Sequence, residues 1–193
     1  MKHERLRHHL KKLIYTDERT AEVGLLVRLR LPWLIVGLLV GTLITLLISN
    51  YEHVLAEQVQ LAFFIPVIVY LSGAVSTQTE TIYVRNLSLG KAPFGVYLFK
   101  EFILGIIIGT ITGALLGLFA YFWLDSTAIG LTVGLATAVS LVSATSIAVL
   151  VPTVLSKLGK SDPALGAGPF TTVLQDFISL LIYFSVASAI ILN

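Results

Sequence analysis

Long runs without a charged residue alternate with short charged segments along this chain. Four runs contain no Asp, Glu, Lys or Arg: 31–51, 58–79, 102–124 and 126–156. A fifth run, 163–193, contains a single charge, Asp176. A helix needs about 20 predominantly apolar residues to cross the hydrocarbon core of a membrane, and only helices or closed barrels satisfy the backbone there. The runs are too long and unbroken for barrel strands, so the pattern predicts five transmembrane helices.

The predicted helices form one all-α membrane domain over 31–193. They cover about 31–51, 59–87, 95–124, 128–157 and 163–192, the second continuing past Glu80. Residues 1–30 are expected to form a separate basic segment, helical in two pieces, with Thr16 as a helix cap. Two interpretations of that segment remain open: a helix lying on the cytoplasmic membrane surface, or a solvated segment that fixes the topology.

The sign of the charge alternates between the predicted loops. Eight of the 13 Lys and Arg residues precede Leu31, and the loops after the second and fourth helices are also basic. The loops after the first and third helices carry only acidic charge, at Glu52, Glu57 and Asp125. Basic loops remain on the cytoplasmic side. The N-terminus is therefore expected on the cytoplasmic side of the cell membrane and the C-terminus on the outer side. No cleavable signal is expected at the start.

Composition narrows the class of protein. The chain is 56% hydrophobic and only 12% charged, with a mean hydropathy of +0.90, whereas soluble domains carry about 25% charged residues. This excludes a soluble protein and gives no surface for nucleic acid. The absence of cysteine excludes disulfides and thiolate metal sites. We expect no enzyme, because no nucleophile–base pair or His-x-x-x-His spacing occurs.

Glycine recurs at a spacing of four residues in the third predicted helix. The stripe comprises Gly105, Gly109, Gly113 and Gly117, and shorter stripes occur at Gly37/Gly41 and Gly130/Gly134. Such stripes let two membrane helices approach closely. We expect this contact within one chain rather than between subunits.

Three prolines fall inside the apolar runs: Pro66, Pro152 and Pro169. A proline inside a helix lacks an amide hydrogen and frees the carbonyl four residues earlier. The sequence therefore predicts three kinks, with the carbonyls of Ala62, Ala148 and Leu165 available to line a wet cavity.

Asp176 is the most informative single residue, because it lies close to the middle of the last predicted helix. A carboxylate at that depth costs on the order of 3 kcal/mol, and no Lys or Arg occurs at matching depth to pair with it. Gly168, Thr172 and Asp176 are spaced by four residues and so share one helix face. Oxygen ligands without Cys or membrane His favour Mg²⁺ or Ca²⁺ over zinc or copper. We interpret these three residues as a cation site.

A second polar cluster lies in the second predicted helix. Its candidates for lining an ion path are Gly73, Ser76, Thr77, Gln78 and Glu80. A run this polar is out of place against lipid and should face a partner helix or a pore. For Glu80 an alternative is equally open: a surface ion pair with Arg85 or Lys100.

At these clusters the sequence resembles the membrane domain of the MgtE magnesium channel family. The last helix carries the closest likeness, in Asp162-Pro163-Ala164-Leu165, Gly168-Pro169-Phe170 and Asp176 followed by Leu180-Leu181-Ile182-Tyr183-Phe184-Ser185. Phe63-Phe64-Ile65-Pro66, Thr77-Gln78, Lys100-Glu101 and Arg30-Leu31-Pro32-Trp33 follow the family more loosely. The resemblance covers residues 30–193.

The resemblance implies a homodimer of five-helix subunits with the ion path at the dimer interface. It makes Asp176 the pore carboxylate that binds a largely hydrated Mg²⁺, with Gly168 and Thr172 lining the pore. Two departures stand out. The family's GGNxGxQS segment reads Ser72-Gly73-Ala74-Val75-Ser76-Thr77-Gln78-Thr79 here, and only about 30 residues precede the first helix. The large cytoplasmic sensing domains of longer members are therefore not expected.

The sequence thus predicts transport of Mg²⁺ through a pore at a dimer interface. Two alternatives stay open. The chain could carry Ca²⁺, Mn²⁺ or Na⁺ with the same architecture, or it could be a non-conducting membrane subunit whose polar helices bind a partner protein.

Overall fold

The computed structural model describes residues 23–157 and 163–192, and all regular structure in these ranges is helical. The five long helices are α2 (Val23–Ile48), α4 (Ile65–Ser88), α5 (Phe94–Leu124), α6 (Thr127–Lys157) and α7 (Pro163–Ile191). Short helical turns η1 (Ser49–Tyr51), α3 (Glu52–Glu57) and η2 (Val59–Phe64) connect α2 to α4. The predicted cap at Thr16 and most of the basic segment lie outside the described residues.

Five segments are long and apolar enough to cross a membrane, as the sequence predicted. They are Leu34–Glu57, Val59–Ser88, Phe94–Leu124, Thr127–Lys157 and Phe170–Ile191. The first helix differs from its expected bounds, because α2 (Val23–Ile48) already includes Val23 and Arg28 before its apolar part. A long basic side chain near a helix end can reach the membrane surface, so the charge does not end the helix.

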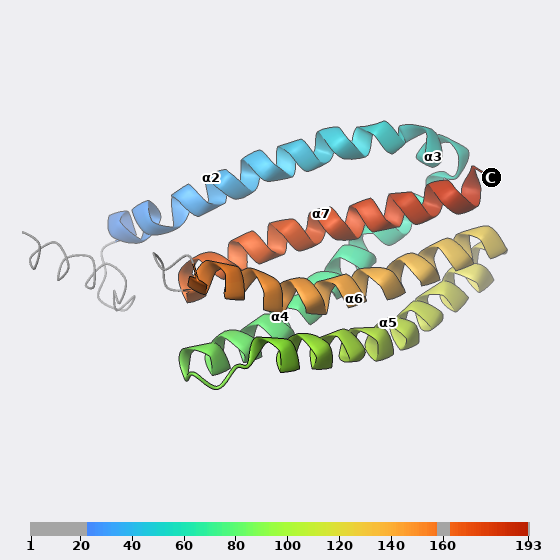
Figure 1. Cartoon of the computed structure of the whole chain (residues 1–193). Coiled ribbons are helices and arrows are strands. Elements are labelled where there is room, and N and C mark those ends of the chain that lie inside the picture. Colours follow the sequence, from blue (N-terminus) through green and yellow to red (C-terminus); the bar gives the residue numbers. More distant parts are fainter. Residues whose placement is uncertain (1–22, 158–162, 193) are drawn as a thin grey trace, which may run out of the picture.

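Helix α6 forms the centre of the bundle (Figure 1). It packs against α5 on one side and α7 on the other, and α4 crosses behind to contact both α6 and α7. Helix α2 lies along α7 at the edge. Sixteen residues of α6 are buried, whereas α2 exposes large apolar side chains such as Leu34, Leu38 and Leu46. The bundle is therefore a packed core of α4 to α7 with α2 attached on one side.

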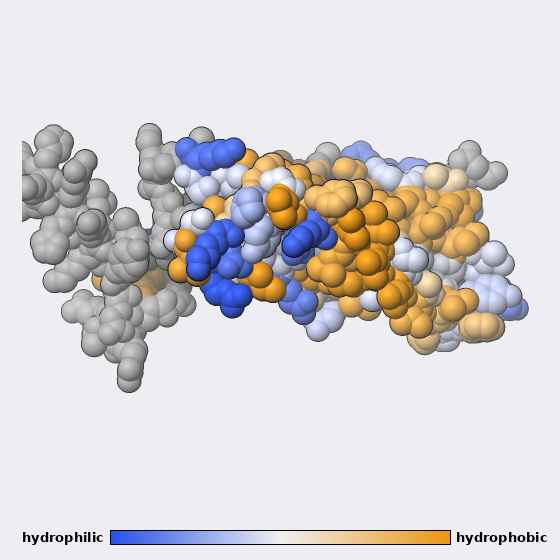
Figure 2. Space-filling model, turned by 60° about the horizontal axis from the view of Figure 1, so that its bottom comes forward, coloured by the Kyte–Doolittle hydropathy of each residue, from blue (hydrophilic) through white to orange (hydrophobic). Residues whose placement is uncertain are grey.

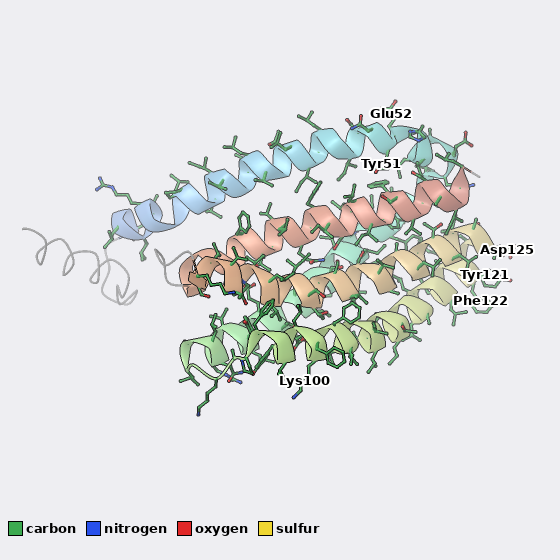
Figure 3. All side chains as sticks on the ribbon, in the orientation of Figure 1. Tyr51, Glu52, Lys100, Tyr121, Phe122 and Asp125 are labelled. Carbon is green, nitrogen blue, oxygen red and sulfur yellow. The ribbon has the colours of Figure 1, made fainter. Side chains whose placement is uncertain are left out.

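The two ends of the bundle carry opposite charge. Figure 3 shows Asp125 at one end, next to Tyr121 and Phe122, Glu52 toward the same end beside Tyr51, and Lys100 toward the other. We call these the acidic end (Glu52, Glu57, Asp125) and the basic end (Arg28, Arg85, Lys91, Lys100, Lys157). Between them lies a broad apolar band, which Figure 2 shows on one face. A lipid-facing surface has this pattern, with aromatic residues near its border.

The glycine stripe of α5 packs directly on the backbone of α6. A Cβ on Gly109 would lie 2.6 Å from the carbonyl oxygen of Ala138, and one on Gly113 would lie 2.5 Å from that of Gly134. Any side chain on these residues would collide with backbone, which confirms close packing within one chain. The short stripe of α2 makes no such backbone contact: a Cβ on Gly37 would lie 3.5 Å from the side chain of Val173, and one on Gly41 would meet nothing within 4 Å.

The kink predicted at Pro66 is absent. Pro66 stands in the first turn of α4, directly after η2, where no helical amide bond is lost. The carbonyl of Ala62, expected to be free, accepts the backbone N–H of Ile65. By contrast Pro152 lies inside α6 and is buried, and Pro169 lies within α7.

A tyrosine joins the last helix to the start of α4. The hydroxyl of Tyr183 donates a hydrogen bond to the carbonyl oxygen of Leu61 at 2.6 Å, and both residues are fully buried. This bond satisfies a carbonyl at the irregular junction of η2 and α4. In the hydrocarbon region of a membrane, no water is available to form a hydrogen bond with such a carbonyl.

Replacing Tyr183 by Phe should therefore lower the stability of the bundle. The buried carbonyl of Leu61 would lose its partner, at a cost of about 1–3 kcal/mol. Thermal unfolding of the purified protein in detergent measures the effect. Tyr70→Phe is the matched control, since Tyr70 is 70% exposed and its loss of a hydroxyl should leave the melting temperature unchanged. Equal melting temperatures for the two variants would contradict the assignment.

Candidate functional site

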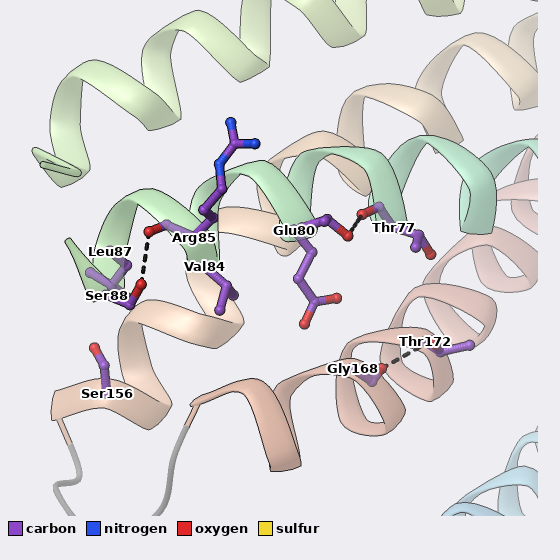
Figure 4. A pocket seen from close by; sticks show the side chains of 10 residues that line it. Thr77, Glu80, Val84, Arg85, Leu87, Ser88, Ser156, Gly168 and Thr172 are labelled. Atoms are coloured by element: carbon purple, nitrogen blue, oxygen red, sulfur yellow. Dashed lines mark hydrogen bonds between the residues drawn. The ribbon is translucent and has the colours of Figure 1, made fainter. Parts of the chain in front are cut away.

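A cleft of about 830 Å³ opens between α4 and α7 toward the basic end (Figure 4). Its walls combine hydroxyl, charged and apolar side chains. They are formed by Thr77, Glu80, Thr81, Val84, Arg85, Leu87 and Ser88 of α4, Ser156 of α6, and Gly168 and Thr172 of α7. A cleft with charged and hydroxyl side chains within a membrane-length bundle is a typical setting for an ion or solute site.

Four residues that the sequence singled out come together in this cleft. Thr77 and Glu80 line it from α4, and Gly168 and Thr172 line it from α7. The hydroxyl of Thr172 donates to the carbonyl oxygen of Gly168 at 3.0 Å, so its lone pairs remain available to a ligand. A Cβ on Gly168 would meet nothing within 4 Å, which leaves the backbone open to the cleft.

Within residues 23–157 and 163–192, the Glu80 carboxylate is the only acidic group that lines this cleft. Figure 4 shows it pointing from α4 toward α7, while the Arg85 side chain points the other way. Glu80 is half-buried, and Thr171 of α7 lies beside its carboxylate. The carboxyl group of Glu80 therefore faces the cleft and not Arg85. The alternative of a surface ion pair with Arg85 is wrong, and that with Lys100 stays a prediction.

Asp176 lies one helical turn beyond Thr172 on α7, nearer the middle of the bundle. Its side chain is half-buried and does not line the cleft. Within residues 23–157 and 163–192, no three His, Cys, Asp or Glu side chains gather into a group that could hold a metal ion. A cation at Asp176 would therefore meet fewer than three such side chains from the described part of this chain and would keep water in its shell.

The other candidates of α4 point elsewhere. Ser76 is 2% exposed and faces the interior, whereas Gln78 is exposed on the outside and does not line the cleft. A Cβ on Gly73 would meet nothing within 4 Å. Thr79 donates to the carboxylate of Glu101 on α5 at 2.8 Å. The polar side chains of α4 thus point into three different surroundings: the cleft, the interior of the bundle and its outer surface.

Sequence reasoning missed several residues at the mouth of the cleft: Val84, Leu87, Ser88 and Ser156. A signal for two of them was present. Thr77, Thr81, Val84 and Ser88 follow the spacing of one helix face. Ser156 carried no such signal, since only the fold brings the end of α6 next to α4.

Comparison with known proteins identifies relatives for most of the chain. Residues 65–186 match the family model described as MgtE, divalent cation transporter. The chain is 36% identical over 165 residues to the magnesium transporter MgtE of Bacillus subtilis, which covers 84% of this chain. It is 36% identical over 162 residues to that of Enterococcus faecalis and 30% identical over 162 residues to that of Thermus thermophilus.

The alignments cover 82–84% of this chain but only 35–36% of each relative. The chain therefore spans about a third of the length of the curated relatives it matches. Five membrane-length helices and these relatives together make the chain a multi-pass membrane protein.

Proposed function

Because this chain belongs to the MgtE family of divalent cation transporters, we propose that it carries Mg²⁺ across the cell membrane. The observation that supports this best is the cleft between α4 and α7, where Thr77, Glu80, Gly168 and Thr172 meet. Carboxylate, hydroxyl and carbonyl oxygens are the ligands of hard cations. The relatives at 36% identity are named magnesium transporters.

The ion path runs along one face of α7. Gly168, Thr172 and Asp176 follow one another at one-turn spacing, from the cleft toward the middle of the bundle. Thr172 is exposed and Asp176 half-buried, although both lie in a membrane span. Polar groups at such depth face water or another protein surface rather than lipid. A second copy of the chain across a two-fold axis would close the path and add a second Asp176.

The basic end lies in the cytoplasm. Its Arg and Lys residues are grouped there by the fold, and positive charge is retained on the cytoplasmic side. In this orientation the cleft is the cytoplasmic mouth of the path, the N-terminus is inside and the C-terminus is outside.

Cation flux into liposomes tests the proposal. The purified chain is reconstituted, and entry of Mg²⁺, Ca²⁺, Mn²⁺ and Na⁺ is followed separately with indicators trapped inside. We expect Mg²⁺ entry well above that of protein-free liposomes. If another cation enters faster than Mg²⁺, that cation and not Mg²⁺ is the transported ion. Absence of flux for all four would contradict transport and favour a non-conducting subunit.

Replacing Glu80 by Gln should reduce Mg²⁺ flux about 5-fold. The carboxylate concentrates cations at the mouth of the path, and its loss removes about 1 kcal/mol of attraction to a hydrated ion. Initial rates of Mg²⁺ entry into liposomes measure the change. Glu52→Gln makes the same substitution at the exposed acidic end and should keep the wild-type rate. If Glu80→Gln also keeps that rate, the residue has no place in the path.

A further inference from the structure

A second group of polar side chains lies inside the bundle, separate from the cleft. It comprises Ser72 and Ser76 of α4, Ser140 of α6 and Gln175 of α7, each at most 2% exposed. The three serine hydroxyls and the side-chain carbonyl oxygen of Gln175 have no hydrogen-bond partner among the described residues. Buried polar groups without partners cost free energy, above all in a membrane. Four of them in one core need an explanation.

The heights of α4 and α6 are fixed by one hydrogen bond. Tyr83 Oη lies 2.7 Å from Thr153 Oγ1, whose own hydrogen is given to the carbonyl of Val149. Tyr83 is therefore the donor. The two helices run in the same direction (Figure 1). Ser72 lies 11 residues before Tyr83, and Ser140 lies 13 residues before Thr153. At about 1.5 Å per residue, the two serines differ in height by about 3 Å.

The relative heights of α4 and α7 follow from one pair of residues in the two helices. Thr171 of α7 lies beside Glu80 of α4 where the two helices pack together. These helices run in opposite directions (Figure 1). One helical turn from Glu80 toward the middle of the bundle leads to Ser76, and one turn from Thr171 in the same direction leads to Gln175. Ser76 and Gln175 therefore lie at the same height. The amide nitrogen of Gln175 donates to Ser179 at 2.8 Å, which leaves its carbonyl oxygen as a free acceptor.

The four residues also lie on faces that meet. Ser72 and Ser76 lie on the same side of α4 as Tyr83, which points toward α6. They precede Tyr83 by 11 and 7 residues, and both spacings are close to a whole number of helical turns. Ser140 is turned by about 160° from Ala138, whose backbone contacts Gly109 of α5. It therefore faces away from α5, where α4 and α7 pack on α6.

We propose that Ser72, Ser76, Ser140 and Gln175 hold ordered water in the middle of the bundle. Water suits this set because it donates to the Gln175 carbonyl oxygen and exchanges hydrogen bonds with hydroxyls, and a buried water makes about three such bonds. A cation suits it less well, since none of the four groups carries charge. This water site lies between α4, α6 and α7 and does not depend on which cation the chain carries.

The sign of a stability change distinguishes bound water from unpaired hydroxyls. Ser72→Ala and Ser140→Ala each remove a partner of the water, so each should lower the melting temperature by about 2–4 °C. If the hydroxyls were unpaired, alanine would remove a buried polar group and the melting temperature would stay equal or rise. Ser143→Ala is the control, because that hydroxyl bonds to the carbonyl of Ser140 at 2.7 Å in its own helix. It should change the melting temperature less.

Infrared difference spectra test the occupant directly on the wild-type chain. Dried membranes exchanged from H₂¹⁶O to H₂¹⁸O should show shifted O–H bands from protected water, and Ser140→Ala should lose part of this signal. No protected water band in the wild type would overturn the proposal. A melting temperature that rises with Na⁺ in the wild type, and not in Ser140→Ala, would assign a cation instead and overturn it as well.

Discussion

Asp176→Asn is expected to lower Mg²⁺ flux roughly 100-fold, the largest effect on transport of any single change in this chain. Asparagine keeps the shape and one oxygen of the side chain but removes the charge that attracts the ion. Loss of one partner from a desolvated charged contact costs about 3 kcal/mol, or a factor of about 100. Initial rates of Mg²⁺ entry into liposomes, at equal amounts of reconstituted protein, give the ratio.

Asp125 provides a matched control for this experiment. It lies exposed between α5 and α6 at the acidic end, with φ of 48°. Asparagine adopts this left-handed backbone readily, so Asp125→Asn makes the same chemical change without strain. It should keep the wild-type rate. Both variants should elute from a sizing column like the wild type. A flux within two-fold of wild type for Asp176→Asn would falsify the role of this carboxylate.

Alanine at both Gly109 and Gly113 is expected to have the largest effect on stability. Each new Cβ would lie within 2.6 Å of a backbone carbonyl oxygen of α6, and backbone cannot rotate away as a side chain can. Overpacking costs typically 1–3 kcal/mol per site, so the pair should lose about 3 kcal/mol or more. Thermal unfolding in detergent and the fraction of monodisperse protein measure the loss.

Gly41→Ala separates this collision from a general effect of removing glycine. A Cβ at Gly41 meets nothing within 4 Å, and alanine favours the helix by about 1 kcal/mol over glycine. The control should melt at or above the wild-type temperature. If the Gly109 and Gly113 double variant also melts there, the contact between α5 and α6 is looser than the structure has it.

The number of helices could be predicted because charge-free runs of about 20 or more residues rarely occur except in helices that cross a membrane. The glycine stripe of α5 could also be read, since four-residue spacing fixes a helix face before any partner is known. The start of α2 could not, because a helix can continue through Arg28 outside the apolar region. Nor could the position of Pro66, since the sequence does not show that η2 interrupts the helix just before it.

For the candidate site, the residues were easier to predict than their surroundings. Thr77, Glu80, Gly168 and Thr172 were identified from polarity and spacing, and the structure brings them into one cleft. Ser76 belongs to the same polar run but faces the interior. A run that is polar on every side offers no periodicity to separate its faces, so only the packing of α6 and α7 against α4 decides where each side chain points.

The contact between α5 and α6 has a mechanical consequence. Where two helices touch through their backbones at Gly109 and Gly113, no side chains remain between them to rearrange, and neither helix can turn about its axis without collision. The two helices therefore move as one rigid unit. Any widening or narrowing of the cleft must come from displacement of α4 or α7 relative to this unit. The hydrogen bonds of Tyr83 and Tyr183 are the fixed points of that movement.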